Sequence, residues 1–244
     1  NPVDPNLTPG TNNNYRTGNG VGYYFNMDYT EKNSGWFFEV GGRSKDFRAD
    51  AGFTRRTNSN FAFFMHRNST ESKPKASIIK IDWRKFSGVD YDWNGRLQGW
   101  NVGNNFNFAL QRSIFIWAEA GMFYEKIYEE EFGLKRGVTR GGQFAGAPER
   151  GTWQQYFSGN INQTVSKKFN YGLFLGYINN AYDFDFAHSP QDPQPGKQFD
   201  AEVYAEYKPI NPLRASISYR KSRLVRNDKK ARVFDYEFVG VGSN

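Results

Sequence analysis

Two histidines are the side chains of this chain best suited to acid–base chemistry. His188 is followed by Ser189 and preceded at a short distance by Asp185, and these residue types together activate a hydrolytic nucleophile when a fold aligns them. Adjacency along the chain does not create that alignment, and no nucleophile motif accompanies it. His66 lies inside an alternating apolar segment that is typical of a strand. We therefore expect a protein that is not an enzyme and has no catalytic residue; a hydrolase at the rim of the fold is the weaker alternative.

Metal and cofactor sites are also weakly marked. The chain has no cysteine, which excludes disulfides and thiolate ligands, and no histidine spacing suits zinc. Asp183, Asp185 and Asp192 offer the oxygen ligands that calcium prefers, but their spacing is not specific. Gly141 and Gly142 indicate a turn rather than a phosphate loop, because no helix is predicted to follow them. We expect neither a metal nor a cofactor.

Charged side chains recur at every second residue of several segments, and a period of two places them on one face of a strand. Around the turn at residues 208–212, pairing symmetric about Ile210 sets Glu206 opposite Arg214 and Asp200 opposite Arg220. The same pairing makes the other face wholly apolar, and a one-residue slip would exchange the two faces. We therefore predict a water-filled lumen on the charged side. The charged residues predicted to face this lumen are Arg48, Asp50, Lys80, Asp82, Arg84, Asp200, Glu202, Glu206, Arg214 and Arg220.

The elements that position these residues are predicted to be strands, because glycine and proline interrupt every helical window. Residues 1–18 indicate an extended linker, and residues 19–244 a single β-domain. The twelve predicted strands are 20–30, 35–43, 46–55, 60–68, 75–87, 92–110, 113–128, 152–165, 168–186, 197–208, 212–226 and 231–242.

Short and long connections alternate between these predicted strands. Barrels of the outer membrane have short periplasmic turns and longer external loops. This comparison predicts a periplasmic N-terminus and an external loop at residues 129–151, long enough to enter the barrel mouth or bind a partner. An ordinary surface loop is the alternative. The basic residues of this predicted external loop are Lys135, Arg136, Arg140 and Arg150.

The composition favours a membrane barrel over a soluble sandwich. Aromatic residues make up 18% of the 244 residues, yet the mean hydropathy is strongly polar. A soluble two-sheet protein needs an aliphatic core, whereas a barrel in lipid exposes aromatic girdles and turns half of each strand to water. We therefore predict an all-β, antiparallel transmembrane β-barrel of the outer-membrane type, with about 12 strands. A soluble β-sandwich or a lipocalin-like barrel is the structural alternative.

The net charge of +7 does not indicate a nucleic-acid-binding protein, because acidic residues are interspersed and no dense basic stripe is present. Solvated loops and paired charges in the lumen account for this net charge, and attraction to lipopolysaccharide is the alternative explanation. We expect contacts with outer-membrane lipid and lipopolysaccharide.

The residues Trp36–Gly42 and Asp46–Arg55, above all Arg48-Ala-Asp-Ala-Gly-Phe53, carry a family resemblance. The chain from about residue 20 resembles the C-terminal β-barrel of uncharacterised Gram-negative outer-membrane proteins, whose N-terminal domain is similar to carbohydrate-binding module family 9. That domain has no counterpart here, so no ligand residues carry over. The resemblance implies a location in the outer membrane. It also implies a barrel that continues past Asn244, because the last residues lack a terminal aromatic side chain.

Two functions follow from these expectations. The first is a porin-like channel that passes small polar solutes through the charged lumen; the resemblance adds carbohydrate as one candidate solute. The alternative is a structural or docking barrel with a filled lumen, which binds a partner protein through its external loops.

Overall fold

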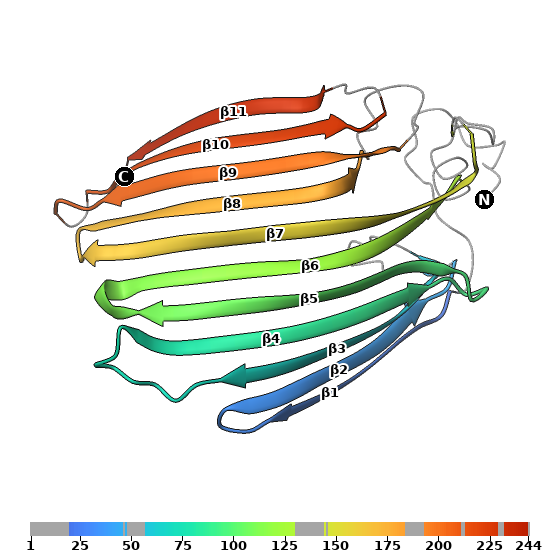
Figure 1. Cartoon of the computed structure of the whole chain (residues 1–244), viewed down its shortest axis with the longest axis horizontal. Helices are drawn as coiled ribbons and strands as arrows, with labels where there is room; N and C mark the ends of the chain where they lie inside the picture. Colours follow the sequence, from blue (N-terminus) through green and yellow to red (C-terminus); the bar gives the residue numbers. More distant parts are fainter. Residues whose placement is uncertain are drawn as a thin grey trace, which may run out of the picture.

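The computed structural model describes residues 20–45, 47, 57–129, 144, 146–183, 193–210, 213–228 and 232–243. This part of the chain forms one antiparallel sheet in which every strand pairs with the next strand in sequence (Figure 1). The strands are β1 (Gly22–Thr30), β2 (Ser34–Arg43), β3 (Ser59–Ser69), β4 (Ile78–Tyr91), β5 (Leu97–Leu110), β6 (Ile114–Tyr128), β7 (Glu149–Ser166), β8 (Phe169–Tyr182), β9 (Pro195–Tyr207), β10 (Ala215–Arg226) and β11 (Arg232–Ser243). A single 3-10 turn, η1 (Gln111–Ser113), joins β5 to β6. No helix among the described residues is long and apolar enough to cross a bilayer.

Eleven of the twelve predicted strands are confirmed, and the prediction at 46–55 is the exception. Asp46 and residues 48–55 lie outside the described residues, as does the predicted linker 1–18. Because β2 pairs directly with β3, the sheet has no place for a strand between them. Alternation predicts which face a residue occupies in a strand, but it does not predict which segments become neighbours.

The connections lie at the two opposite ends of the strands, and we call each row of strand ends an edge. The edge that we call the short-turn edge holds the connections 31–33, 70–77, 111–113, 167–168 and 208–214, of two to eight residues each. The edge that we call the long-loop edge holds 44–58, 92–96, 129–148, 183–194 and 227–231, of five to twenty residues each. The predicted segregation of the longest connections is therefore confirmed.

The predicted orientation of the N-terminal strand is wrong. We expected the chain to enter the sheet at the edge opposite to the 129–151 loop. In the structure β1 begins at Gly22, opposite Arg43, on the long-loop edge that also holds residues 129–148. The reason is parity, because removing one strand before β3 reverses the direction of every later strand relative to β1.

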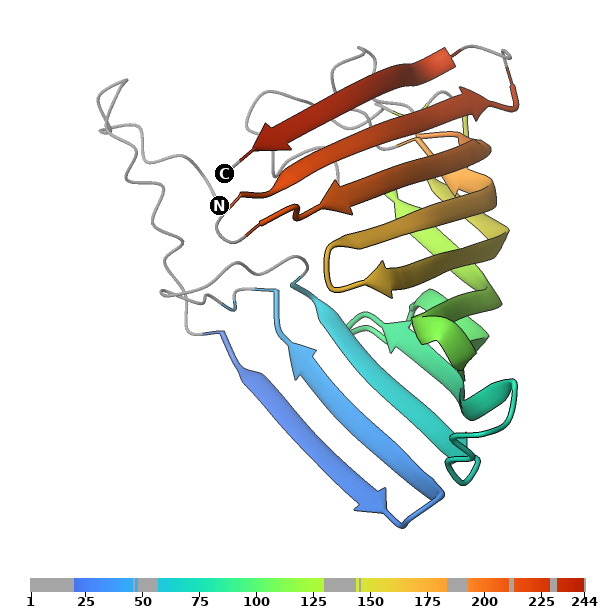
Figure 2. The same ribbon diagram turned by 90° about the vertical axis from the view of Figure 1, so that its left-hand side faces the viewer.

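The sheet is strongly curved, so that it has a concave and a convex face (Figure 2). Among the described residues its two outer strands, β1 and β11, are not paired with each other. The number of strands is odd and all pairs are antiparallel, so β1 and β11 run in the same direction, as their arrows in Figure 1 show. The all-β antiparallel prediction is confirmed, whereas closure into a barrel is not seen in the described residues.

Glycines on the concave face let aromatic rings lie close against the sheet. A Cβ atom on Gly103 would come within 2.5 Å of the Phe86 ring and 2.6 Å of the Tyr156 hydroxyl. These two side chains reach over β5 from the neighbouring parts of the sheet, and Gly103 lies directly opposite Gly121 on β6. A side chain at this position would force the rings away from the strand.

The 92–96 connection is held by one buried carboxylate. The Asp92 side chain accepts hydrogen bonds from the backbone N–H groups of Asn94 and Arg96 at 2.9 and 2.8 Å, and from Arg96 Nε at 2.6 Å. Gly95 has a φ of +78°, which a residue without a Cβ adopts without strain. Burial alone would raise the pKa of Asp92, but these N–H donors and the Arg96 charge outweigh it and lower that pKa below its ordinary value.

We predict that Gly103→Ala lowers the free energy of unfolding by about 1–3 kcal/mol, because the added methyl group overpacks the Phe86 and Tyr156 rings. Gly99→Ala on the same strand is the matched control, since its Cβ would have no neighbour nearer than 3.4 Å. Urea unfolding followed by tryptophan fluorescence measures both. Equal effects at the two positions would contradict the close approach of the rings.

A second prediction concerns acid stability. A carboxylate whose pKa is lower in the folded state stabilises the fold above its unfolded pKa, and this contribution disappears as the pH falls through the folded pKa. Asp92→Asn should therefore cost about 1–3 kcal/mol at neutral pH, and less below about pH 4, where the unfolded carboxylate protonates. Urea-unfolding midpoints across this pH range measure the difference. A loss independent of pH would show that the carboxylate charge does not stabilise the turn.

Candidate functional site

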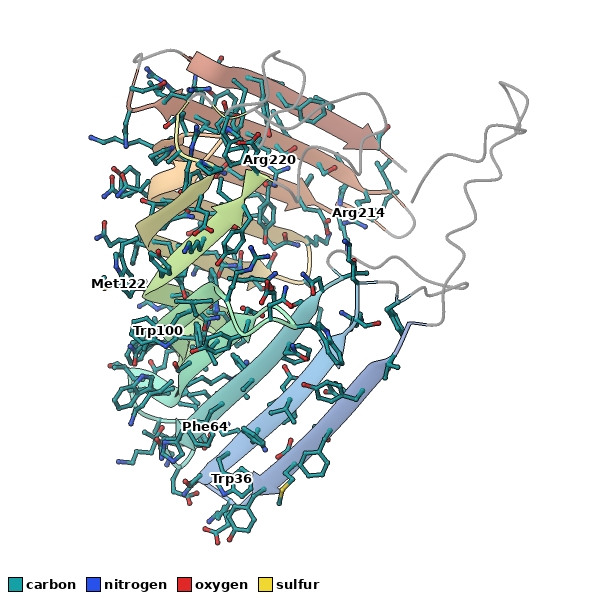
Figure 3. The ribbon with its side chains drawn as sticks, turned by 90° about the vertical axis from the view of Figure 1, so that its right-hand side faces the viewer. Trp36, Phe64, Trp100, Met122, Arg214 and Arg220 are labelled. Carbon is teal, nitrogen blue, oxygen red and sulfur yellow. The ribbon has the colours of Figure 1, made fainter. Side chains whose placement is uncertain are left out.

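The convex face has an apolar middle band. The strand register places Leu173 opposite Val203 and Leu175 opposite Ala201, and the register of β6 with β7 continues the band through Ala118 and Ala120. No described segment covers these side chains: Leu173, Leu175 and Val203 are 37%, 40% and 50% exposed. Figure 3 shows Met122 and Trp100 pointing outward on the same face.

Aromatic rings border this band toward both edges. Toward the long-loop edge, Trp153 packs with its ring centroid 5.2 Å from that of Trp100 and 5.4 Å from that of Tyr124. Toward the short-turn edge, Trp83 stacks on Phe106 at 5.4 Å and Tyr29 on Trp36 at 6.0 Å. Other rings that complete these two rows are Tyr23, Trp93 and Tyr177 near the long loops, and Phe108, Phe169, Tyr171 and Tyr207 near the short turns.

The convex face carries charge where sequence reasoning predicted only apolar residues. Lys221 lies opposite Ala201, level with the middle band, and its Nζ atom is 2.8 Å from Asp235 Oδ1 and 2.7 Å from Glu237 Oε1. Arg223 Nε lies 3.9 Å from Asp235 Oδ2. The convex face of β10 is therefore apolar only toward the short-turn edge, whereas β9 keeps the apolar Ala201 and Phe199 opposite Lys221 and Arg223. Alternation predicted the face of these residues correctly. The prediction was wrong in extending the apolar character of the rest of this face to Lys221 and Arg223.

Lys85 is a second charged position on the convex face. It lies opposite His66, and its Nζ atom is 3.8 Å from the centre of the Trp83 ring. His66 Nε2 is 3.5 Å from Ser34 Oγ. His66 therefore lies on the outer surface of the sheet, away from the concave charged residues.

The predicted charged residues of β9 and β10 share the concave face, but their partners are shifted by two residues. Arg220 lies opposite Glu202, with Nε 3.3 Å from Oε2, instead of opposite Asp200. Asp200 instead lies opposite Ser222, which donates a hydrogen bond to it. The connection spans seven residues, 208–214, and this longer turn moves the register without exchanging the faces. Figure 3 shows Arg214 and Arg220 on the concave side.

Glu206 is the most enclosed charge of this group. It is only 8% exposed and accepts a hydrogen bond from Asn170 Nδ2 at 3.3 Å. Lys208 Nζ lies 3.1 Å from its carboxylate, and Arg214 forms the ion pair that the sequence predicted, from the 208–214 connection instead of a strand. A cavity of about 410 Å³ adjoins these residues, with Tyr204 among its lining side chains.

The predicted charges of β4 also lie on the concave face. Lys80 Nζ is 2.9 Å from Asp82 Oδ1, and Arg84 lies opposite Asn105. Asn105 belongs to a polar chain that sequence reasoning missed: Asn107 donates to Asn105 at 2.7 Å, and Asn105 donates to Glu119 at 3.1 Å. The uncharged asparagines at alternate positions of β5 were the available signal.

The same face contains an aromatic zone, which the prediction of a charged and wet face did not include. The Phe63 ring lies 6.4 Å from Phe37 and 6.1 Å from Phe86, each measured between centroids. Further along the sheet, Phe123 lies 6.0 Å from Tyr156. The concave face thus combines a zone of rings over β2 to β7 with charged groups on both sides of it, such as Lys80 nearer the short-turn edge and Glu125 nearer the long-loop edge.

The remaining predicted positions do not assemble a site. Arg150 belongs to strand β7 instead of the predicted loop, where Nη1 donates to the Pro193 carbonyl at 2.8 Å and the guanidinium lies 4.5 Å from the Phe144 ring centre. Asp183 forms an ion pair with Arg226 at 3.4 Å. Within the described ranges no group of histidine and acidic side chains could hold a metal ion. The predicted positions outside the described residues are Arg48, Asp50, Lys135, Arg136, Arg140, Asp185, His188, Ser189 and Asp192.

No protein-family model matches the chain, and no curated protein matches it in sequence.

Proposed function

We propose that the eleven strands form part of the wall of an outer-membrane β-barrel in a Gram-negative bacterium, with a porin-like, charged lumen for small polar solutes. The observation that carries the proposal is the exposed aliphatic band between two aromatic rows on the convex face. Lipid-facing barrel surfaces have an apolar band about 25 Å tall with aromatic girdles on both sides. Tyr171 and Tyr177 mark the two rows on β8, about 20 Å apart at about 3.3 Å per residue.

Burial supports lipid on the convex side. Only a handful of apolar side chains are buried among the described residues, including Ile127, Tyr182 and Leu224, and no second layer of the described chain covers the sheet. In water, a contiguous apolar surface of this extent favours aggregation. A bilayer removes the same surface from water, so it supplies the hydrophobic stabilisation that a protein core otherwise supplies.

The concave face supports passage of polar solutes. It presents both signs of charge, as in the Arg220–Glu202 pair, together with the amide chain through Asn105. Such groups hydrogen-bond water and polar solutes. Carbohydrate is one candidate solute class. The sequence suggests it by resembling outer-membrane proteins that carry a domain similar to a sugar-binding module.

The docking barrel is the second candidate, and the aromatic zone of the concave face favours it. Rings such as Phe63 and Phe86 occupy space on the side where a lumen would lie. If they fill it, the long connections of the long-loop edge become the surface that a partner protein contacts.

Ion selectivity tests the channel. We expect single-channel steps in planar bilayers from the protein with its complete wall, and Arg220→Gln on the concave face should shift the reversal potential in a salt gradient toward cation preference. Arg223→Gln makes the same charge change on the convex face of the same strand and should leave selectivity unchanged. If the protein with its complete barrel wall is inserted but shows neither conductance steps nor solute-dependent liposome swelling, the channel is excluded and the docking barrel remains.

Closure of the wall imposes a further condition. Because β1 and β11 run in the same direction, direct pairing between them would be parallel. Bacterial outer-membrane barrels close with antiparallel pairs and an even number of strands. We propose that an odd number of strands beyond the eleven lies between β11 and β1 in the complete wall.

Cysteine cross-linking tests this closure, since the chain has no native cysteine. Ser218→Cys with Gly240→Cys, directly opposite each other on β10 and β11, should form a disulfide and serves as the positive control. Pairs that combine Tyr24→Cys or Asn26→Cys on β1 with Phe238→Cys or Gly240→Cys on β11 should form none. An efficient intramolecular disulfide between β1 and β11 would show a parallel seam and contradict the proposal.

A further inference from the structure

Basic residues are concentrated at one edge of the sheet. Each of the five connections on the short-turn edge contains lysine or arginine, whereas Glu31 and Glu71 are their only acidic residues. Their formal charge is therefore +6, while the five connections of the long-loop edge sum to zero. Nearly all of the net charge of the chain thus lies at one end of the strands. The residues of this basic rim are Lys32, Lys73, Lys75, Arg112, Lys167, Lys168, Lys208 and Arg214.

The basic rim is accessible, and the described residues do not neutralise most of its charge. All eight side chains are exposed. Lys32 pairs with Glu71 at 2.9 Å, and Lys208 and Arg214 share Glu206 while remaining about half exposed. The other five form no ion pair with a described residue. These cations are therefore available to an anionic partner.

Apolar side chains surround the cations of the basic rim. Ile210 and Leu213, between Lys208 and Arg214, are 65% and 46% exposed, and Val165, just before Lys167, is 56% exposed. The aromatic row of the convex face, with Trp83 and Phe106, borders the same edge. Alternating apolar and basic groups suit an interface where acyl chains meet phosphate, because lysine extends its charge outward from an apolar stem. A nucleic acid would leave the apolar groups unpaired.

We propose that the basic rim binds the phosphate-bearing headgroups of anionic lipids in the leaflet at the short-turn edge. The inference depends on the proposed membrane location, because the lipid must already contact the convex face. The cations are spread over five turns, so they act through a shared surface potential and not through one pocket. Each lysine or arginine near an anionic membrane surface adds a similar increment of attraction, which salt screens.

Tryptophan quenching by brominated lipids tests the membrane location and the binding of anionic headgroups separately. The folded chain is placed in vesicles of phosphatidylcholine mixed with phosphatidylglycerol, and either lipid is brominated. Quenching by brominated phosphatidylcholine reports the lipid contact of the convex tryptophans, and the ratio of the two quenching curves reports preference for the anionic lipid. We expect a preference of about fivefold at low salt, which one lysine at the surface would supply, and a decline as salt increases.

Two double variants with the same change in charge locate the effect. Lys167→Gln with Lys168→Gln, two unpaired lysines of the basic rim, should lower the preference for phosphatidylglycerol by about 1.5-fold, because they are two of eight cations that contribute similar increments. Lys45→Gln with Lys197→Gln, two exposed lysines near the long-loop edge, should not change it.

The outcomes distinguish the two proposals. No quenching by brominated phosphatidylcholine would overturn the membrane location itself. Quenching without preference for phosphatidylglycerol, or equal losses in both double variants, would leave the membrane location intact and overturn the basic rim as a lipid site. If inorganic phosphate abolishes the preference where chloride at equal ionic strength does not, the rim binds free phosphate and the headgroup proposal is wrong.

Discussion

The antiparallel register between sequence neighbours is the constraint on which the rest of the structure depends. Each strand pairs with the strand before it and the strand after it, so the face of one residue determines the face of its partners across the whole sheet. A shift by one residue would exchange the two faces, whereas a shift by two preserves them. The hairpin of β9 and β10 shows this: its pairing differs by two residues from the symmetric one, yet Glu202 and Arg220 remain on the concave face.

A single curved sheet that no other described segment covers depends on its surroundings for stability. Its buried apolar residues are few among those described, and many of its large aromatic and aliphatic side chains are exposed on the convex face. Close contacts such as those of the Phe86 and Tyr156 rings over Gly103 strengthen the sheet locally. They cannot replace a core, and the proposed lipid contact follows from that deficit.

Neither face of the sheet is uniform: the convex face is not wholly apolar and the concave face is not wholly charged. Lys221, Asp235 and Glu237 place mutually paired charges on the convex side of β10 and β11, level with the apolar band. If the convex face contacts lipid as proposed, unpaired charges at the midplane cost about 2–4 kcal/mol for lysine or arginine, and the pairing limits that cost. On the concave side, the Phe37–Phe63–Phe86 zone reduces the width of any lumen. Both departures occur where alternation holds but residue character changes along the strand.

The sequence by itself determined the class of the fold, eleven of the twelve strands that it predicted and the separation of faces, because a period of two is a local property of the pleated backbone. It did not determine that β2 pairs directly with β3, or that Arg150 belongs to β7. The sequence also could not place the basic rim at one edge. Residues as distant in sequence as Lys32 and Arg214 lie at the same edge only because of the directions in which their strands run. Strand partners and directions depend on contacts between segments remote in sequence, so only the tertiary structure decided them.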